Sequence, residues 1–360
     1  MTPQPPTALR VAVTGPTGTL GFGLMPLLQA DDRVAHVTGV ARRPFDPGAC
    51  GWTKAEYRRG DVRDPRVLRD AFGRADVVVH LAFQVTGAAS GQTIRSVNID
   101  GTLNAFDAAA AAGVSRFVYA SSVAAYGFHR DNPVGMTEDW PVRPAARLFY
   151  AREKAALERL LQARAAAPGA PALYVLRPSI VLGPHAVGGK SLPRGPLGAA
   201  ARALARWSTR PGRIPLPVPA PELPVQLVHE QDVGQALLQC VAAAGPPGAY
   251  NIAADGVVTG GILARELGLR PLPVPPRLVR AGARAAARAV AVLPFLPPAA
   301  QWVEAASNPP IMDTTRAKRE LGWVPRFTAL ETLRDTLRRP GGTPQRAGAA
   351  AAGRDDAARS

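Results

Sequence analysis

The stretch 9–21 constrains this chain most, because an apolar run there ends in three regularly spaced glycines. Gly15, Gly18 and Gly21 follow the pattern Gly-x-x-Gly-x-x-Gly, and a helical pattern comes next. This order predicts a strand, a tight turn and a helix N-terminus, whose N–H groups and dipole can hold a pyrophosphate. Glycine also lets a dinucleotide approach the backbone. The stretch therefore predicts a nucleotide cofactor, with an ordinary turn as the alternative.

Length and residue usage indicate a soluble protein with a proper core. The chain has 360 residues, of which 47% are hydrophobic, enough for one large or two modest domains. Cys50 and Cys240 predict no disulfide framework, and the five His and two Cys lack metal-ligand spacing. No stretch approaches the roughly 20 apolar residues that cross a bilayer, and residues 1–8 lack signal-peptide regions. We expect a cytoplasmic location, no membrane contact and no metal.

The chain is strongly basic, with 43 Lys and Arg against 27 Asp and Glu and a net charge of +16. Such a balance can serve nucleic acid or an anionic membrane. The basic residues are scattered, however, and aromatic residues that could stack on bases make up 6% of the chain. A general bias towards Ala, Arg, Pro and Gly accounts for the charge. We expect no nucleic-acid partner.

Up to residue 180, strand-like and helix-like segments alternate, which predicts βαβ units and a parallel sheet. Beyond Pro178 the sequence becomes rich in Gly, Pro and basic residues over 183–224. The predicted strands are 9–14, 34–41, 77–82, 116–121, 173–177, 225–229 and 249–253. The predicted helices are 20–29, 67–72, 97–112, 149–167, 232–243, a basic helix within 271–298 and a last helix at 314–321.

These segments predict an α/β fold, a doubly wound parallel sheet of the Rossmann type with a smaller, interleaved C-terminal substrate domain. The dinucleotide-binding domain is expected over residues 8–180, with 225–255 returning to it. The substrate domain is expected over 181–335. Residues 340–360 are low-complexity Gly, Ala and Arg, which predicts a disordered tail.

Tyr150 and Lys154 are four residues apart, so they would share one helix face. A free tyrosine has a pKa of about 10, and a neighbouring ammonium lowers it by favouring the phenolate. The pair therefore predicts proton transfer, although surface helices also produce this spacing by chance. Ser121 and Ser122 end a predicted strand, at the edge where α/β sheets bind ligands. Their hydroxyls can bond a substrate oxygen or simply cap a turn.

A series of motifs occurs in a fixed order along the chain. They are Gly15-x-x-Gly18-x-x-Gly21, Asp61-Val62-Arg63-Asp64, His80-Leu81-Ala82, Asn98-x-x-Gly101-Thr102, Ser122-x-x-x-Tyr126-Gly127, Tyr150-x-x-x-Lys154, Leu176-Arg177-Pro178, Val228-His229-x-x-Asp232-Val233 and Tyr250-Asn251-Ile252. Together these motifs resemble the extended short-chain dehydrogenase/reductase family, the group of NAD-dependent epimerases and dehydratases, over about residues 9–335.

The resemblance implies that Tyr150 is the general acid/base and that Lys154 lowers its pKa and binds the nicotinamide ribose. It implies that Ser122 orients the substrate oxygen, with Val123 beside it in the substrate site. The implied cofactor-binding residues are Gly15, Thr17, Gly18, Thr19, Leu20 and Gly21 at the pyrophosphate, Asp61 and Val62 at the adenine, Leu81, Ala82 and Phe83 at the adenosine and ribose, and Pro178 and Ser179 near the nicotinamide.

One departure from the family concerns the cofactor. Members that prefer NAD usually carry an acidic residue after the second strand, where it binds the ribose 2′-hydroxyl. This chain has Arg42 and Arg43 there. A guanidinium could pair with a 2′-phosphate, whereas the alternative is a solvated arginine pair. We expect NADP rather than NAD, with Arg42 among the binding residues.

Other departures concern the substrate. Val123 and Ala124 replace the Asp-Glu pair of sugar-nucleotide dehydratases, which argues against water elimination. Ile180 and the stretch around Val225 replace an Asn and an Arg typical of sugar-nucleotide enzymes. We expect an apolar wall and a small hydrophobic ketone or secondary alcohol as substrate.

The leading hypothesis is an NAD(P)-dependent oxidoreductase that acts on a carbonyl or secondary alcohol. The alternatives are an epimerase of a sugar or sugar nucleotide with transient oxidation, and a non-catalytic dinucleotide-binding protein. The expected partner is a small-molecule substrate, and the protein is a possible homodimer.

Overall fold

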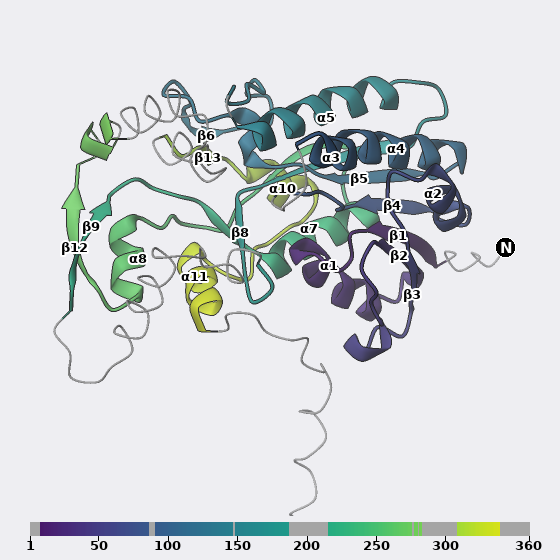
Figure 1. The fold of residues 1–360 in the computed structure, drawn as a ribbon, viewed down its shortest axis with the longest axis horizontal. Helices are drawn as coiled ribbons and strands as arrows, with labels where there is room; N and C mark the ends of the chain where they lie inside the picture. The colour runs from purple at the N-terminus through teal and green to yellow at the C-terminus, as the bar shows by residue number, and fades with distance from the viewer. Residues whose placement is uncertain are drawn as a thin grey trace, which may run out of the picture.

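The computed structural model describes residues 8–85, 91–146, 148–186, 215–275, 277–279, 281–282 and 308–338. Its centre is a seven-stranded sheet in the order β11-β7-β5-β4-β1-β2-β3, with every pair parallel (Figure 1). The predicted doubly wound α/β fold is confirmed. The strands are β1 (Leu9–Thr14), β2 (Val34–Ala41), β3 (Ala55–Arg59), β4 (Val77–His80), β5 (Arg116–Ala120), β7 (Ala172–Pro178) and β11 (Gly248–Ile252).

Helices cover both faces of the sheet (Figure 1). One face carries α2 (Pro65–Phe72), α4 (Gly101–Ala111) and α5 (Phe149–Ala165), and the other carries α1 (Thr19–Ala30) and α7 (Glu230–Val241). The central strands are therefore mostly apolar rather than alternating, because both faces are buried.

The strand order reverses between β1 and β4. From β1 the chain moves outward to β2 and β3, and from β4 it moves the other way to β5, β7 and β11. In such sheets the carboxyl ends of the strands on either side of the reversal form the ligand crevice. The turns after β1 and β4 are therefore where a ligand is expected.

The remaining described segments form three small two-stranded sheets beside the main one. Each pair joins distant parts of the chain, so these segments are interleaved. The pairs are β8 (Ile180–Leu182) with β10 (Leu227–His229), β9 (Pro217–Pro221) with β12 (Arg270–Val274), and β6 (Val134–Met136) with β13 (Ile311–Met312). The helices there are α8 (Gly260–Glu266), α10 (Thr315–Glu320) and α11 (Ala329–Arg338).

Several strands differ from the sequence-based expectation, because β3 and most strands of the small sheets were not predicted, namely β6, β8, β9, β12 and β13. The predictions missed β3, because this edge strand is polar and its residues are exposed or half-buried. Strand β12, which contains Pro271 and Pro273, was not predicted, whereas the described residues 277–279 and 281–282, within the stretch expected to hold a basic helix, are helical. Proline has no N–H to donate and is tolerated in such a two-stranded edge pairing. Most of the predicted loops 183–224, most of the helix within 271–298 and the tail 340–360 lie outside the described residues.

Among the helices, α8 was not predicted, and two further segments differ from the expectation. The single helix expected over 97–112 is split into α3 (Gly91–Arg95), a π-turn at Ser96–Asp100 and α4. The expected last helix is followed by α11. A capping box precedes α11, because Thr328 Oγ1 accepts from the Glu331 N–H while the Glu331 carboxylate accepts from the Thr328 N–H. That Thr-x-x-Glu spacing was a readable signal for the missed helix.

Helices α1 and α7 pack with their backbones in contact. A Cβ on Gly23 would lie 2.0 Å from the Glu230 carbonyl oxygen, and a Cβ on Gly234 would lie 2.1 Å from that of Gly23. Real side-chain atoms do not approach so closely, so both positions require glycine for space. This contact fixes α1, whose N-terminus carries the glycine turn, against the sheet.

We expect Gly234→Ala to destabilise the protein by about 1–3 kcal/mol, because the added methyl group must push the two helices apart. The matched control is Gly91→Ala in α3, where a Cβ meets nothing within 4 Å. That substitution should be neutral or stabilise by up to about 1 kcal/mol. Urea unfolding of both variants measures the difference, and equal midpoints would contradict the packing described.

Candidate active site

The glycine turn after β1 has the geometry of a phosphate-binding loop. Gly15 has φ +74°, and a Cβ on it would lie 2.9 Å from the Ala82 backbone nitrogen. A Cβ on Gly21 would lie 2.2 Å from the Pro16 carbonyl oxygen. Side chains are therefore excluded at both positions, which leaves the backbone open to a ligand.

The first intrahelical bond of α1 runs from the Phe22 N–H to the Gly18 oxygen at 2.9 Å. The N–H groups of Thr19, Leu20 and Gly21 precede it, as the unsatisfied donors of a helix N-terminus do. Thr17 is half-buried beside them. These donors and the positive end of the helix dipole suit a pyrophosphate.

The polar residues implied at the adenosine end lie after β2 and β3. Arg42 and Arg43 are exposed, and Arg42 donates to Gln84 Oε1 at 3.4 Å. Asp61 accepts from the Arg63 guanidinium at 2.8 and 3.1 Å, and these bonds hold the pKa of Asp61 below its usual range. Val62 is buried beneath them.

The segment after β4 connects the glycine turn to the predicted catalytic residues. Leu81 donates its N–H to the Thr14 oxygen at 3.0 Å, which ties this segment to β1. The Phe83 ring meets the Tyr150 ring edge to face, with centroids 5.6 Å apart. Lys154 Nζ lies 3.7 Å from the Phe83 ring centroid. Phe83 is therefore common to the predicted cofactor and catalytic sites.

Ser122, Tyr150 and Lys154 come together from two elements. Ser122 follows β5 and is buried, whereas Tyr150 and Lys154 lie in the first two turns of α5. Ser122 and Tyr150 share a side-chain hydrogen bond. Ser122 Oγ also accepts from the Ala124 N–H at 3.2 Å, so the turn-capping alternative is seen alongside the contact with Tyr150. Lys154 Nζ donates to the Ala120 oxygen at 2.6 Å.

The electrostatics differ from the expectation for Tyr150. Burial raises the pKa of its phenol, and the bond with Ser122 offsets this only in part. Lys154 is not among the groups that lower this pKa here, since its ammonium lies 5.9 Å from the Tyr150 ring centroid and donates to the Ala120 oxygen. The role of Lys154 towards Tyr150 with cofactor and substrate bound stays a prediction. Burial lowers the pKa of Lys154 to about 7, while Glu158 and Glu153 raise it in part.

Pro178 and Ser179 lie at the carboxyl end of β7, next to β5. The Ser179 N–H donates to the Ile252 oxygen at 2.9 Å, while its buried hydroxyl lacks a hydrogen-bond partner within the described residues. A buried polar atom without a partner is costly. Together with the glycine cradle, this hydroxyl fits the polar edge of a nicotinamide cofactor.

The expected apolar wall is not one surface. Val123 packs with Tyr126 and Met136, whereas Val225 packs against a separate cluster that includes Val258. The Ile180 side chain belongs to neither cluster and is 49% exposed.

The sequence-based predictions missed Glu153 and Glu158 behind the site, and they named Asn98 and Arg177 in motifs without assigning them a role. Asn98 donates to Glu153 at 2.7 Å, and Glu158 binds Arg177. The extended spacing Tyr150, Lys154, Glu158 on one face of α5 could have shown that Glu158 follows them inward. Among the described residues, no group of three or more His, Cys, Asp or Glu side chains is arranged to hold a metal, and no helix is long and apolar enough to cross a membrane.

The lowered pKa of Lys154 predicts that the stability of the protein depends on pH. Its usual value is 10.5, so between pH 7 and 10.5 the unfolded chain binds more protons at this residue than the folded one. The contribution of Lys154 to the free energy of unfolding should therefore rise by about 3 kcal/mol from pH 7 to 9.5. Urea unfolding of wild type and Lys154→Met at both pH values measures it, with Lys318→Met, at a half-buried position, as control. A flat difference would contradict the assignment.

Comparison with known proteins places this site in context. The model of the NAD dependent epimerase/dehydratase family matches residues 11–253. An uncharacterized protein of Mycobacterium tuberculosis (strain ATCC 25618 / H37Rv) is 30% identical over 348 residues, covering 93% of this chain and 85% of its own. An L-arabinose 1-dehydrogenase (NAD(P)(+)) of Haloferax volcanii is 36% identical over 113 residues, covering 31% of this chain and 41% of its own.

Among solved structures, UDP-glucose 4-epimerase of Thermotoga maritima, crystallised with UDP-glucose, shares the fold. Its TM-score is 0.67 at 22% identity, with 92% of this chain and 98% of that chain covered. The family match extends from β1 through β11 and includes the glycine turn, Ser122, Tyr150 and Lys154. The chain belongs to the NAD dependent epimerase/dehydratase family.

Proposed function

We propose that this protein is an NAD(P)-dependent oxidoreductase that moves a hydride between the nicotinamide and the carbon of a carbonyl or secondary alcohol. The observation that carries the proposal is the meeting of Ser122, Tyr150 and Lys154 beside Phe83. Phe83 belongs to the segment that touches the glycine turn. The proton-transfer residues and the proposed dinucleotide site are thus contiguous.

In this proposal the cofactor supplies or accepts the hydride. The glycine turn, Asp61, Val62, Leu81, Ala82, Phe83, Pro178 and Ser179 would hold it. Ser122 hydrogen-bonds the substrate oxygen, and Tyr150 removes its proton during oxidation or returns it during reduction. Only protonated Lys154 can stabilise the phenolate, so its pKa of about 7 makes this support sensitive to pH near neutrality.

Arg42 supports NADP as the preferred cofactor. Its guanidinium is exposed after β2, where the ribose of a dinucleotide on the glycine turn would lie, and its charge contributes to lowering the pKa of Asp61. Asp61 is a nearby carboxylate that could repel a phosphate, but it forms an ion pair with Arg63.

The second candidate is an epimerase that oxidises and re-reduces a sugar or sugar nucleotide without net release of reduced cofactor. The epimerase fold neighbour favours it, whereas the L-arabinose 1-dehydrogenase relative favours net oxidation. Absorbance of NAD(P)H during turnover separates them, because only a dehydrogenase or reductase changes it. A role in dinucleotide binding without catalysis is disfavoured, because both Tyr150 and Lys154 are present and both contact the Phe83 ring.

We expect Tyr150→Phe to lower kcat by about 10²–10⁴-fold, because the proton acceptor is lost. The affinity for NADP, measured by fluorescence titration, should stay close to that of wild type. The assay is a panel of ketones and secondary alcohols followed by NAD(P)H absorbance. Tyr174→Phe is the matched control, since its hydroxyl binds the Gly245 oxygen away from the site. Full activity in Tyr150→Phe would refute the proposed chemistry.

We expect Arg42→Ala to weaken NADP binding on the order of tenfold, because a charge-assisted contact with the 2′-phosphate is lost. NAD binding should be unchanged, since NAD lacks that phosphate. Parallel titrations with both cofactors measure the effect, with Arg33→Ala at the opposite end of β2 as control. An equal loss for both cofactors would remove the support for NADP.

A further inference from the structure

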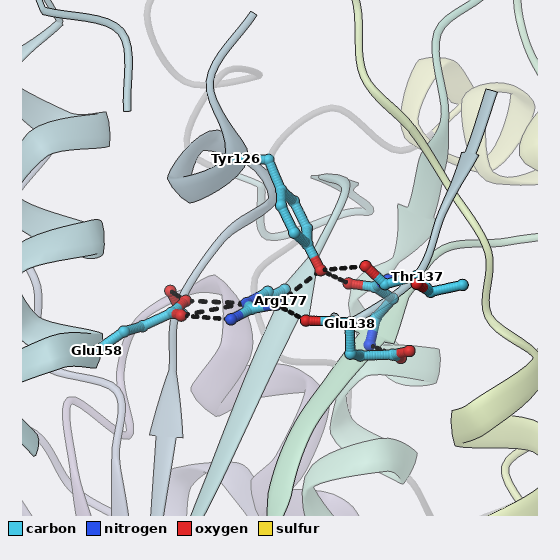
Figure 2. Close-up of polar contacts among 7 residues, drawn as sticks. Tyr126, Thr137, Glu138, Glu158 and Arg177 are labelled. Carbon is cyan, nitrogen blue, oxygen red and sulfur yellow. Dashed lines mark hydrogen bonds and ion pairs between the residues drawn. The ribbon is translucent and has the colours of Figure 1, made fainter. Parts of the chain in front are cut away.

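A buried ion pair lies behind the Ser122, Tyr150 and Lys154 group. Glu158 of α5 and Arg177 of β7 have side chains that are 2% and 4% exposed. Arg177 Nη2 donates to Glu158 Oε2 at 2.7 Å, and its Nε donates to both carboxylate oxygens at 3.1 and 3.2 Å. Figure 2 shows the two side chains facing each other between the helix and the strand. The pair links α5, which carries Tyr150 and Lys154, to the sheet.

The same pair holds both ends of the segment that carries Ser122. At one end, the Ser121 hydroxyl donates to Glu158 Oε1. At the other end, Arg177 Nη1 donates to the Tyr126 hydroxyl at 2.7 Å. Between these residues the chain makes one short 3₁₀ turn, Val123–Tyr126, whose N-cap is Ser122. Ser122 therefore lies inside a loop closed by one ion pair.

The Tyr126 end is further anchored to the interleaved segments. The Tyr126 hydroxyl bonds Asn251 Oδ1 at 2.8 Å and the Thr137 oxygen at 3.2 Å, and Arg177 Nη1 bonds the Glu138 oxygen at 3.0 Å (Figure 2). Burial raises the pKa of Tyr126 to about 12, so this hydroxyl remains neutral. The anchor is thus fixed independently of pH in the ordinary range.

The charges explain why the arrangement is rigid. Burial alone would lower the pKa of Arg177, but the Glu158 charge and its hydrogen bonds raise it, so the guanidinium stays protonated. A buried ion loses much of its stabilisation if its partner moves away. The ion pair therefore resists separation, and it holds the hydroxyl groups of Ser121 and Tyr126 in position.

We propose that Glu158 and Arg177 act as positioning residues that set the distance between Ser122 and Tyr150. The inference rests on the proposed function, since it assigns these residues to the same site. We call the Glu158–Arg177 ion pair, together with its hydrogen bonds to Ser121 and Tyr126, the clamp. If the clamp loosens, the Ser122–Tyr150 hydrogen bond lengthens, the Tyr150 phenolate loses a hydrogen-bond donor, and the substrate oxygen is held less well. Misplacement of reacting groups by about 1 Å can reduce turnover by about 100-fold.

Two variants loosen the clamp without changing its charge. Glu158→Asp keeps the carboxylate but shortens its reach, and Tyr126→Phe removes one hydroxyl from the other end. Each should lower kcat by at least about tenfold at its own pH optimum, with the Kd for NADP unchanged. The control is Arg164→Gln, also on α5, which breaks a partly exposed ion pair with Asp107 of α4 and should leave both values unchanged.

A second readout does not depend on turnover. The phenolate absorbance of each variant, minus that of the same variant with Tyr150→Phe added, reports the ionisation of Tyr150 alone. In Glu158→Asp and Tyr126→Phe this titration should move to higher pH, because the Ser122 donor is withdrawn. The charged and titratable groups around Tyr150 and Lys154, namely Tyr119, His80, Glu153 and Glu158, keep their charge types in both variants.

The outcomes separate the two hypotheses. If the titration moves while wild type shows no net turnover, the clamp stands and the proposed oxidoreductase function fails. If Tyr150→Phe abolishes turnover but neither kcat nor the titration moves in the clamp variants, the positioning role is overturned. Circular dichroism verifies folding, and should Glu158→Asp not fold, Tyr126→Phe decides the test by itself.

Discussion

The backbone contact between the turns after β1 and β4 is the constraint on which the site depends. Gly15 leaves no room for a side chain against Ala82, and Leu81 bonds the Thr14 oxygen at 3.0 Å. These contacts bring the phosphate-binding turn against the segment that carries Phe83. Phe83 in turn touches Tyr150 and Lys154. The close backbone contact at Gly15 therefore helps to position the residues proposed for proton transfer.

Charge balance behind the site is a second organising feature. Lys154 and Arg177 are buried together with Glu153 and Glu158, two cations with two carboxylates. Each carboxylate has a specific partner, Asn98 for Glu153 and Arg177 for Glu158. Burial of such groups is tolerated when they are paired and hydrogen-bonded. Burial nevertheless lowers the pKa of Lys154 to about 7, so small changes in its surroundings can change its protonation near neutral pH.

The predictable parts of the molecule are those in which local pattern and tertiary environment agree. The all-apolar run of β4 and the glycine turn could be read directly, because burial on both faces and a tight turn each leave a distinct composition. Strand β3 could not, since it lies at the sheet edge and carries Glu56, Arg58 and Arg59. Strand β12 was not predicted, because its prolines and basic residue do not indicate a strand until the pairing with β9 is known.

The sequence by itself determined the doubly wound α/β architecture, the glycine turn and the identity of Ser122, Tyr150 and Lys154 as candidates. These follow from periodicity and spacing within short windows. Only the tertiary structure decided the surroundings of those residues: the raised pKa of Tyr150, the Lys154 bond to Ala120, the partnership of Glu158 with Arg177, and the separation of Val123, Ile180 and Val225. Burial and long-range pairing depend on contacts between distant segments, some more than a hundred residues apart, such as Tyr126 and Asn251. No local pattern contains that information.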